Sequence, residues 1–194
     1  MARPTLAGET PRDRVLAVAS ELFYAEGIHA VGVERIIEEA GVAKATLYFH
    51  FKSKDHLVAA YLRDRSDAWR THVARELPRR ATTAENKILA VFDLLEGYCA
   101  DSQYRGCPFV NAAAEYPTHV LVNQVTSAHR EWIRDLFTDL ATEAGFSRGA
   151  ALGAVLSQMY DGMMLSAQLD GNAAVGTITR EAVRALLRDW QRRD

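Results

Sequence analysis

The 194-residue sequence has the composition of an ordinary globular protein, with 48% hydrophobic and 25% charged residues. Its formal net charge of −2 excludes a strong overall attraction to nucleic acid or to anionic lipid, so any contact with a polyanion has to be local. The N-terminus lacks a basic-then-apolar signal pattern, and no run approaches the roughly 20 apolar residues of a membrane helix. We therefore expect a cytoplasmic protein with no membrane partner.

Helical periodicity dominates the sequence, and no segment has a convincing strand pattern. The first predicted helix follows Thr10, whose hydroxyl can cap it, and it has Pro11 at its first position. Gly27 is expected to end it. The sequence thus begins with a well-delimited amphipathic helix.

Two short helices are predicted next, over residues 34–40 and 44–50, on either side of a turn that contains Gly41. Ser53 is expected to cap the helix that follows. Two helices joined by about three residues including a glycine are typical of a helix-turn-helix.

The clearest break between periodic segments spans residues 78–83. Helical spacing resumes with Thr82 and Glu85, which together are expected to form a capping box. Pro108 then begins a short helix that runs to Glu115.

The last third of the chain is also predicted to be helical, with a long amphipathic helix that ends near Gly145. Ser147 is expected to cap a following helix that is apolar nearly all round, and a final helix is predicted from Thr179. The fold class predicted from these patterns is all-α.

One stretch carries a specific resemblance. Residues 34–57, "ERIIEEAGVAKATLYFHFKSKDHL", resemble the DNA-binding motif of the tetracycline-repressor-like (TetR) family of bacterial transcription regulators. The resemblance implies a three-helix DNA-binding domain over residues 1–56, with its motif at about 32–51. It also implies a helical effector-binding and dimerisation domain over 57–194, and about nine helices in all.

The resemblance further implies how the second helix of the motif would meet double-stranded DNA, because this helix enters the major groove in such motifs. Small and apolar side chains allow close approach, and a lysine can donate to guanine. We assign base readout to Ala43, Lys44, Ala45 and Phe49. Hydroxyl, imidazole and ammonium groups can donate to phosphate oxygens, and we assign these contacts to Thr46, Tyr48, His50 and Lys52. Gly32 and Ala43 stand where the family often has serine or threonine.

The family commonly holds a small-molecule effector among its later helices and pairs two chains through its last two. The residues expected to line an effector pocket are mostly apolar with a few polar groups: Phe92, Glu96, Cys99, Phe109, Asn111, His129, Trp132, Met159 and Met163. The residues expected at a homodimer interface are apolar positions of the last two helices: Leu152, Leu156, Val183, Leu186, Leu187 and Trp190.

The expected function is that of a sequence-specific DNA-binding regulator, a homodimeric repressor released from a palindromic operator by an effector. One alternative is a redox-responsive regulator on the same scaffold, with Cys99 and Cys107 as the sensor. Another is an all-helical enzyme, against which stands the absence of HExxH, GxGxxG, P-loop and nucleophile-elbow motifs. We expect no catalytic residues, no metal site and no cofactor. Repression is a tendency of the family, and nothing in the residues excludes activation.

Overall fold

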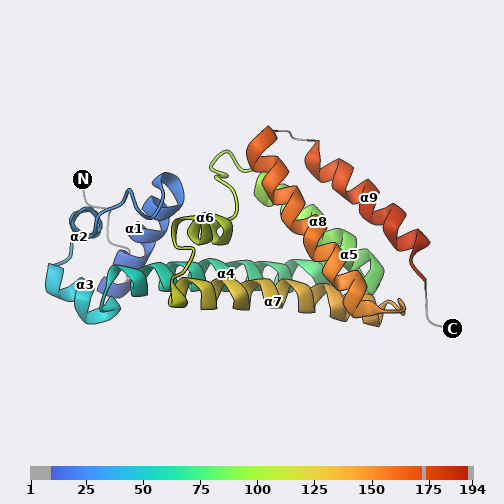
Figure 1. The fold of residues 1–194 in the computed structure, drawn as a ribbon, viewed down its shortest axis with the longest axis horizontal. Helices are drawn as coiled ribbons and strands as arrows, with labels where there is room; N and C mark the ends of the chain where they lie inside the picture. The colour runs from blue at the N-terminus through green and yellow to red at the C-terminus, as the bar shows by residue number, and fades with distance from the viewer. Residues whose placement is uncertain (1–9, 172–173, 192–194) are drawn as a thin grey trace. The chain divides into compact units, whose positions relative to one another are not determined.

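The computed structural model describes residues 10–171 and 174–191, and over these residues it consists of helices without a strand (Figure 1). The all-α prediction is confirmed. The helices are α1 (Pro11–Glu26), α2 (Val33–Ala40), α3 (Lys44–Phe51), α4 (Lys54–Arg80), α5 (Ala84–Cys99), α6 (Pro108–Glu115), α7 (Val120–Glu143), α8 (Gly149–Asp170) and α9 (Val175–Asp189).

The chain forms two compact units. The N-terminal unit comprises the described residues up to Asp67 together with residues 108–127, so it holds α1 to α3, the first half of α4, α6 and the first turns of α7. The C-terminal unit comprises residues 68–107 and the described residues from Ala128 onward. Among the described residues, no helix combines the length and hydropathy needed to cross a membrane.

Local capping explains where the first helix begins and ends. The Thr10 hydroxyl accepts a hydrogen bond from the Asp13 amide at 3.2 Å, and the Asp13 carboxylate accepts one from the Thr10 amide at 3.2 Å. Pro11 occupies the first helical position, where its missing N–H costs no hydrogen bond. Gly27 ends the helix at a φ of 95°, a conformation that strongly favours glycine. The predicted cap, first residue and end are all confirmed.

The predicted cap of α4 is also confirmed, since the Ser53 hydroxyl accepts from the His56 amide at 3.3 Å. The helix continues through Pro78 and ends at Arg80. Because proline removes one intrahelical hydrogen bond, it weakens the last turn, and the break in the sequence pattern marks the end of α4.

Two predicted caps are wrong. Helix α5 is capped by Thr83, not Thr82, because the Thr83 hydroxyl accepts from the Asn86 amide at 3.3 Å. Ser147 does not cap α8, since its hydroxyl donates instead to the Gln191 carbonyl oxygen at 2.8 Å. The residue before α8 is Arg148, at a φ of 54° and without a side-chain cap.

The last helix begins four residues earlier than predicted, at Val175 rather than Thr179. It has no side-chain cap at Ala174, so no capping residue in the sequence marks its start. Gly176 lies within its first turn, where a Cβ atom would come within 2.4 Å of the Glu96 side chain. The helix therefore approaches α5 closely at Gly176, where a larger residue would require the Glu96 side chain to move.

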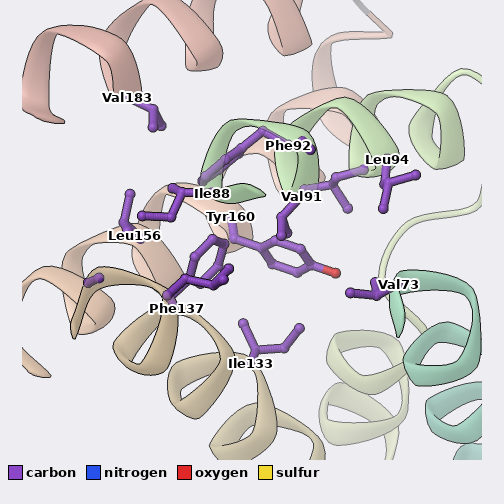
Figure 2. Packing of buried hydrophobic residues seen from close by; sticks show 14 of the residues in the cluster. Val73, Ile88, Val91, Phe92, Leu94, Ile133, Phe137, Leu156, Tyr160 and Val183 are labelled. Atoms are coloured by element: carbon purple, nitrogen blue, oxygen red, sulfur yellow. The ribbon is translucent and has the colours of Figure 1, made fainter. Parts of the chain in front are cut away.

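The core of the C-terminal unit is built from five helices (Figure 2). The Phe92 and Phe137 rings stack at 5.4 Å, and Tyr160 meets Phe137 edge-on at 6.2 Å. Each large side chain buried in this way contributes roughly 1.5 to 3 kcal/mol. Helix α8 crosses α7 closely at Gly153, where a Cβ atom would lie 2.8 Å from the Thr138 backbone nitrogen.

Candidate functional site

The turn between α2 and α3 sets the direction of α3. Gly41 ends α2 in the left-handed conformation, at φ 61° and ψ 41°. Its amide donates to the Glu38 carbonyl oxygen at 3.2 Å, and the Val42 amide donates to the Ile37 carbonyl oxygen at 3.3 Å. These bonds satisfy carbonyl groups that the end of a helix leaves open, as in a Schellman motif. The chain can then reverse and begin α3 at Lys44.

Neither short helix has a side-chain cap, because Gly32 and Ala43 occupy the cap positions. Both helices form nonetheless. Leu47 and Phe51 of α3 are buried, as is Ile36 of α2. Burial of one face compensates for the missing caps, because short helices in proteins are held mainly by tertiary packing.

The opposite face of α3 is exposed. Phe49 is 82% exposed and Tyr48 is 40% exposed, although both are large aromatic residues. Of the eight residues predicted to contact DNA, six are exposed and two, Thr46 and His50, are half-buried. A helix whose exposed face carries aromatic rings and lysines, and whose opposite face is buried in the protein, is suited to entering the major groove of DNA.

Lys52 ends α3 in a conformation unusual for a residue with a side chain, at φ 53° and ψ −43°. Its amide still donates to the Tyr48 carbonyl oxygen at 3.0 Å, which closes the last turn. The side chain is exposed directly beyond the end of α3. Backbone strain of this kind is retained only where the surrounding structure imposes it.

The Arg35 side chain on α2 is hydrogen-bonded to carboxylates of the same chain. Its guanidinium donates to both carboxylate oxygens of Glu26, at 2.6 and 2.8 Å, and to Glu39 at 2.7 Å. The bidentate bond to Glu26 connects the end of α1 to α2. Arg35 is therefore engaged within the N-terminal unit, whereas within the described residues no carboxylate pairs with Lys52, which directly follows α3.

Sequence reasoning missed Glu115, at the end of α6. Its carboxylate accepts hydrogen bonds from the Ile28 amide at 2.9 Å and the His29 amide at 2.6 Å, in the loop after α1. The His29 imidazole contacts the Glu115 carbonyl oxygen at 2.8 Å and stacks on Tyr116. The Lys54 ammonium donates to the Ile28 carbonyl oxygen at 2.6 Å. The paired residues are separated by 86 or 87 positions in the sequence, so no local pattern predicts these contacts.

The predicted pocket residues are distributed over both units. Phe109 and Asn111 belong to the N-terminal unit, and the other seven belong to the C-terminal unit. Phe92 and Met163 lie in the hydrophobic core, and the rings of His129 and Trp132 are 5.9 Å apart. Met159 and Cys99 pack against the same core.

Among the predicted pocket residues, Glu96 takes part in an ion pair. Arg180 of α9 lies 3.3 Å from Glu96 and 2.6 Å from Asp93, both on α5. The hydrogen bond to Asp93, followed by the negative charges of Glu96, Asp93 and Glu181, raises the pKa of Arg180. Glu96 therefore helps to hold α9 against α5.

The two cysteines are free thiols and half-buried. Burial raises the pKa of the Cys99 thiol, which lowers the thiolate fraction at neutral pH. A redox sensor depends on an accessible thiolate, so this environment weighs against the redox alternative. Within the described part of the chain, no cluster of three or more His, Cys, Asp or Glu could hold a metal ion.

The predicted dimer residues divide into two groups. Leu152, Leu156, Val183 and Leu187 are buried, each 2% exposed or less, in the core of the single chain. They pack helix against helix within one protomer and are not free to meet a partner. Leu186 and Trp190 are half-buried.

Trp190 has a role within the protomer, since its indole N–H donates to the Ser147 carbonyl oxygen at 2.8 Å. The large apolar side chains that remain exposed on α8 and α9 are not the residues predicted for the dimer interface. Leu165 is 50% exposed and Leu169 is 73% exposed on α8, and Ile178 is 60% exposed on α9.

The fold and the exposed α3 define a helix-turn-helix protein of the DNA-binding class. Residues 15–61 match the sequence profile described as "Bacterial regulatory proteins, tetR family". The HTH-type transcriptional activator FasR of Mycolicibacterium smegmatis is 34% identical over 152 residues, which cover 74% of this chain and 67% of that protein. The HTH-type transcriptional repressor KstR2 of the same species is 33% identical over 93 residues, which cover 45% of each chain.

The fold is also similar to that of solved structures. SCO4454, a TetR-family transcriptional regulator from Streptomyces coelicolor, is 37% identical and matches with a TM-score of 0.86 over 93% of this chain and 95% of that one. The chain therefore belongs to the TetR family of transcriptional regulators. Regulators of this family bind operator DNA and function as dimers.

Proposed function

We propose that this chain is a cytoplasmic, homodimeric repressor that binds a palindromic operator and leaves it when a small-molecule effector binds. DNA binding is assigned to residues 1–56, and effector binding and dimerisation to residues 57–194. The named relatives include both an activator and a repressor. The direction of control is therefore tested separately from operator binding.

The observation that carries the proposal is the exposed surface of α3. Phe49 is 82% exposed beside Tyr48 and between two exposed lysines, on a helix whose other face is buried. Close approach to base edges is assigned to Ala43, Lys44, Ala45 and Phe49. Phosphate contacts are assigned to Thr46, Tyr48, His50 and Lys52, which carry donor groups suited to phosphate oxygens.

Dimerisation is proposed through the exposed faces of α8 and α9. Figure 1 shows α9 running back along α8, and the two helices are in contact. Leu165, Leu169 and Ile178 leave apolar area in water on these helices. A second copy related by a two-fold axis would present the same face and cover both. Two recognition helices would then meet two half-sites, which is why a palindromic operator is expected.

The test is selection of bound sequences from random double-stranded DNA with the purified full-length chain. Enrichment of an inverted repeat bound by two chains supports the proposal. Binding without sequence preference, or to an asymmetric site by one chain, contradicts it. A reporter gene behind the selected operator then separates the two directions of control, because a repressor lowers its expression and an activator raises it.

A further inference from the structure

Arg70, on the part of α4 that belongs to the C-terminal unit, is only partly satisfied by the protein. Its Nη2 atom donates to the Ala128 carbonyl oxygen at 3.2 Å, and its guanidinium carbon lies 5.1 Å from the centroid of the Trp132 ring. The Nε atom is shielded from solvent and has no hydrogen-bond partner within the described chain. A buried donor without an acceptor is costly, so this Nε atom is available to an acceptor that the protein does not supply.

The charge of Arg70 is also unbalanced. Within the described residues, no ion pair joins Arg70 to a carboxylate. Arg130 provides a contrast, since its guanidinium lies 2.6 Å from Asp161. An arginine without a carboxylate in a half-buried setting attracts anions more strongly than an exposed one, because water screens its charge less.

The pKa of the neighbouring His129 reflects the same excess of positive charge. His129 is buried, and its pKa is lowered to about 4 by burial first and then by the charges of Arg70 and Arg130. It is therefore neutral at pH 7 and supplies no second cation. The Arg70 guanidinium lies over the half-buried Trp132 ring, whose centroid is 5.9 Å from that of the His129 ring.

We propose that Arg70 binds the carboxylate of the effector, and that the effector is an organic acid with a planar aromatic body lying against Trp132. The geometry favours this class because guanidinium groups pair with carboxylates through paired, charge-assisted hydrogen bonds. An aromatic body suits the neighbourhood of Trp132, since aromatic rings also pack edge-on beside one another. This inference rests on the proposed function, which assigns effector binding to this part of the chain.

The experiment uses the purified full-length chain and matched pairs of probes. Benzoate, 2-naphthoate and indole-3-acetate are each compared with the corresponding neutral amide, by titration of tryptophan fluorescence and by thermal denaturation. At least one acid is expected to bind and to raise the melting temperature, and its amide is expected to bind at least tenfold more weakly. If no acid binds better than its amide, the inference is overturned.

Variants then assign the effect to the residue. Arg70→Gln should weaken binding of the acid about 10- to 100-fold and leave amide binding unchanged, and Arg70→Lys should retain part of the affinity. Arg130→Gln, which removes an equal charge from a guanidinium already paired with Asp161, should change acid binding less than twofold. Equal losses in Arg70→Gln and Arg130→Gln would reduce the effect to general electrostatics and contradict the proposal.

Operator binding without any probe separates this inference from the proposed function. All three variants should bind the selected operator as the wild type does. If the wild type binds no operator, the proposed function fails independently of the acid titrations. If it binds the operator but acids and amides are equivalent, only the assignment of Arg70 fails.

Discussion

The ammonium nitrogen of Lys44, at the start of α3, lies 3.1 Å from a carboxylate oxygen of Glu34, at the start of α2. The lysine assigned to base readout is thus ion-paired with an acid of the neighbouring helix in the unbound protein. A hydrogen bond from the Glu34 backbone, followed by the bond from Lys44, lowers the pKa of Glu34. The acid stays charged at neutral pH and competes with DNA for Lys44.

Replacing Glu34 with Gln should therefore strengthen operator binding. The substitution releases Lys44 and removes a negative charge next to the DNA surface. Because both side chains are exposed and screened by water, the gain should be modest, roughly twofold to fivefold in affinity. Operator titration measures it, with Glu181→Gln on α9 as a matched change of charge. Equal gains in both variants would point to net charge rather than to the ion pair.

Lys44→Ala and Lys52→Ala should affect DNA binding in different ways. Loss of a phosphate contact at Lys52 should weaken binding to every sequence and make the salt dependence shallower by about one unit of slope. Loss of a base contact at Lys44 should relax preference at one or two base pairs per half-site, at a cost of roughly 1–3 kcal/mol on the selected operator. Titrations with single-base variants at several salt concentrations distinguish them. If Lys44→Ala lowers affinity equally for all single-base variants, Lys44 contacts the DNA phosphate backbone rather than a base.

The double change Leu165→Glu and Ile178→Glu should dissociate the dimer and abolish operator binding. It places two charges on the exposed faces of α8 and α9, where burial without a partner is costly. Sedimentation at micromolar concentration should find dimers for the wild type and monomers for the variant. Val120→Glu, an equivalent change at a 65% exposed residue of α7, should stay dimeric. A stable wild-type monomer would refute the interface.

Glu115→Ala should loosen the loop after α1. The substitution leaves the Ile28 and His29 amides without their carboxylate acceptor, so the N-terminal unit should lose roughly 1 to 3 kcal/mol of stability. Amide hydrogen exchange should accelerate at these two residues in particular. Glu143→Ala, which removes a more exposed glutamate on α7, is the control. Unchanged exchange at both amides would show that Glu115 does not hold the loop.

Stability should fall between pH 6.5 and 4 because of His129. Its folded-state pKa is lowered to about 4, so the unfolded chain binds this proton at a higher pH than the folded chain does. The stability associated with the neutral imidazole is present above pH 6.5 and decreases as the pH falls toward 4, by about 2 kcal/mol at pH 5. His129→Gln should remove this component in chemical denaturation at pH 7 and 5. His56→Gln, at an exposed histidine, should keep it.

Features that depend on a few neighbouring residues could be predicted from the sequence. The cap at Thr10, the end at Gly27 and the turn at Gly41 each involve groups within about five positions of one another. The helix-turn-helix is likewise contiguous, which is why its exposed face could be assigned in advance. Local errors arose where two hydroxyls were adjacent, as at Thr82 and Thr83, because each can cap the amide three residues further along the chain.

The sequence by itself determined the all-helical fold, the family motif and the surface assigned to DNA, since each follows from short-range periodicity and contiguous residues. Only the tertiary structure decided which apolar side chains stay within one chain. Helix α8 is apolar nearly all round, so its pattern does not distinguish the buried Leu152 and Leu156 from the exposed Leu165 and Leu169. Contacts between distant positions, such as Glu115 with Ile28, depend on how the helices pack, and periodicity along one helix carries no information about its neighbour.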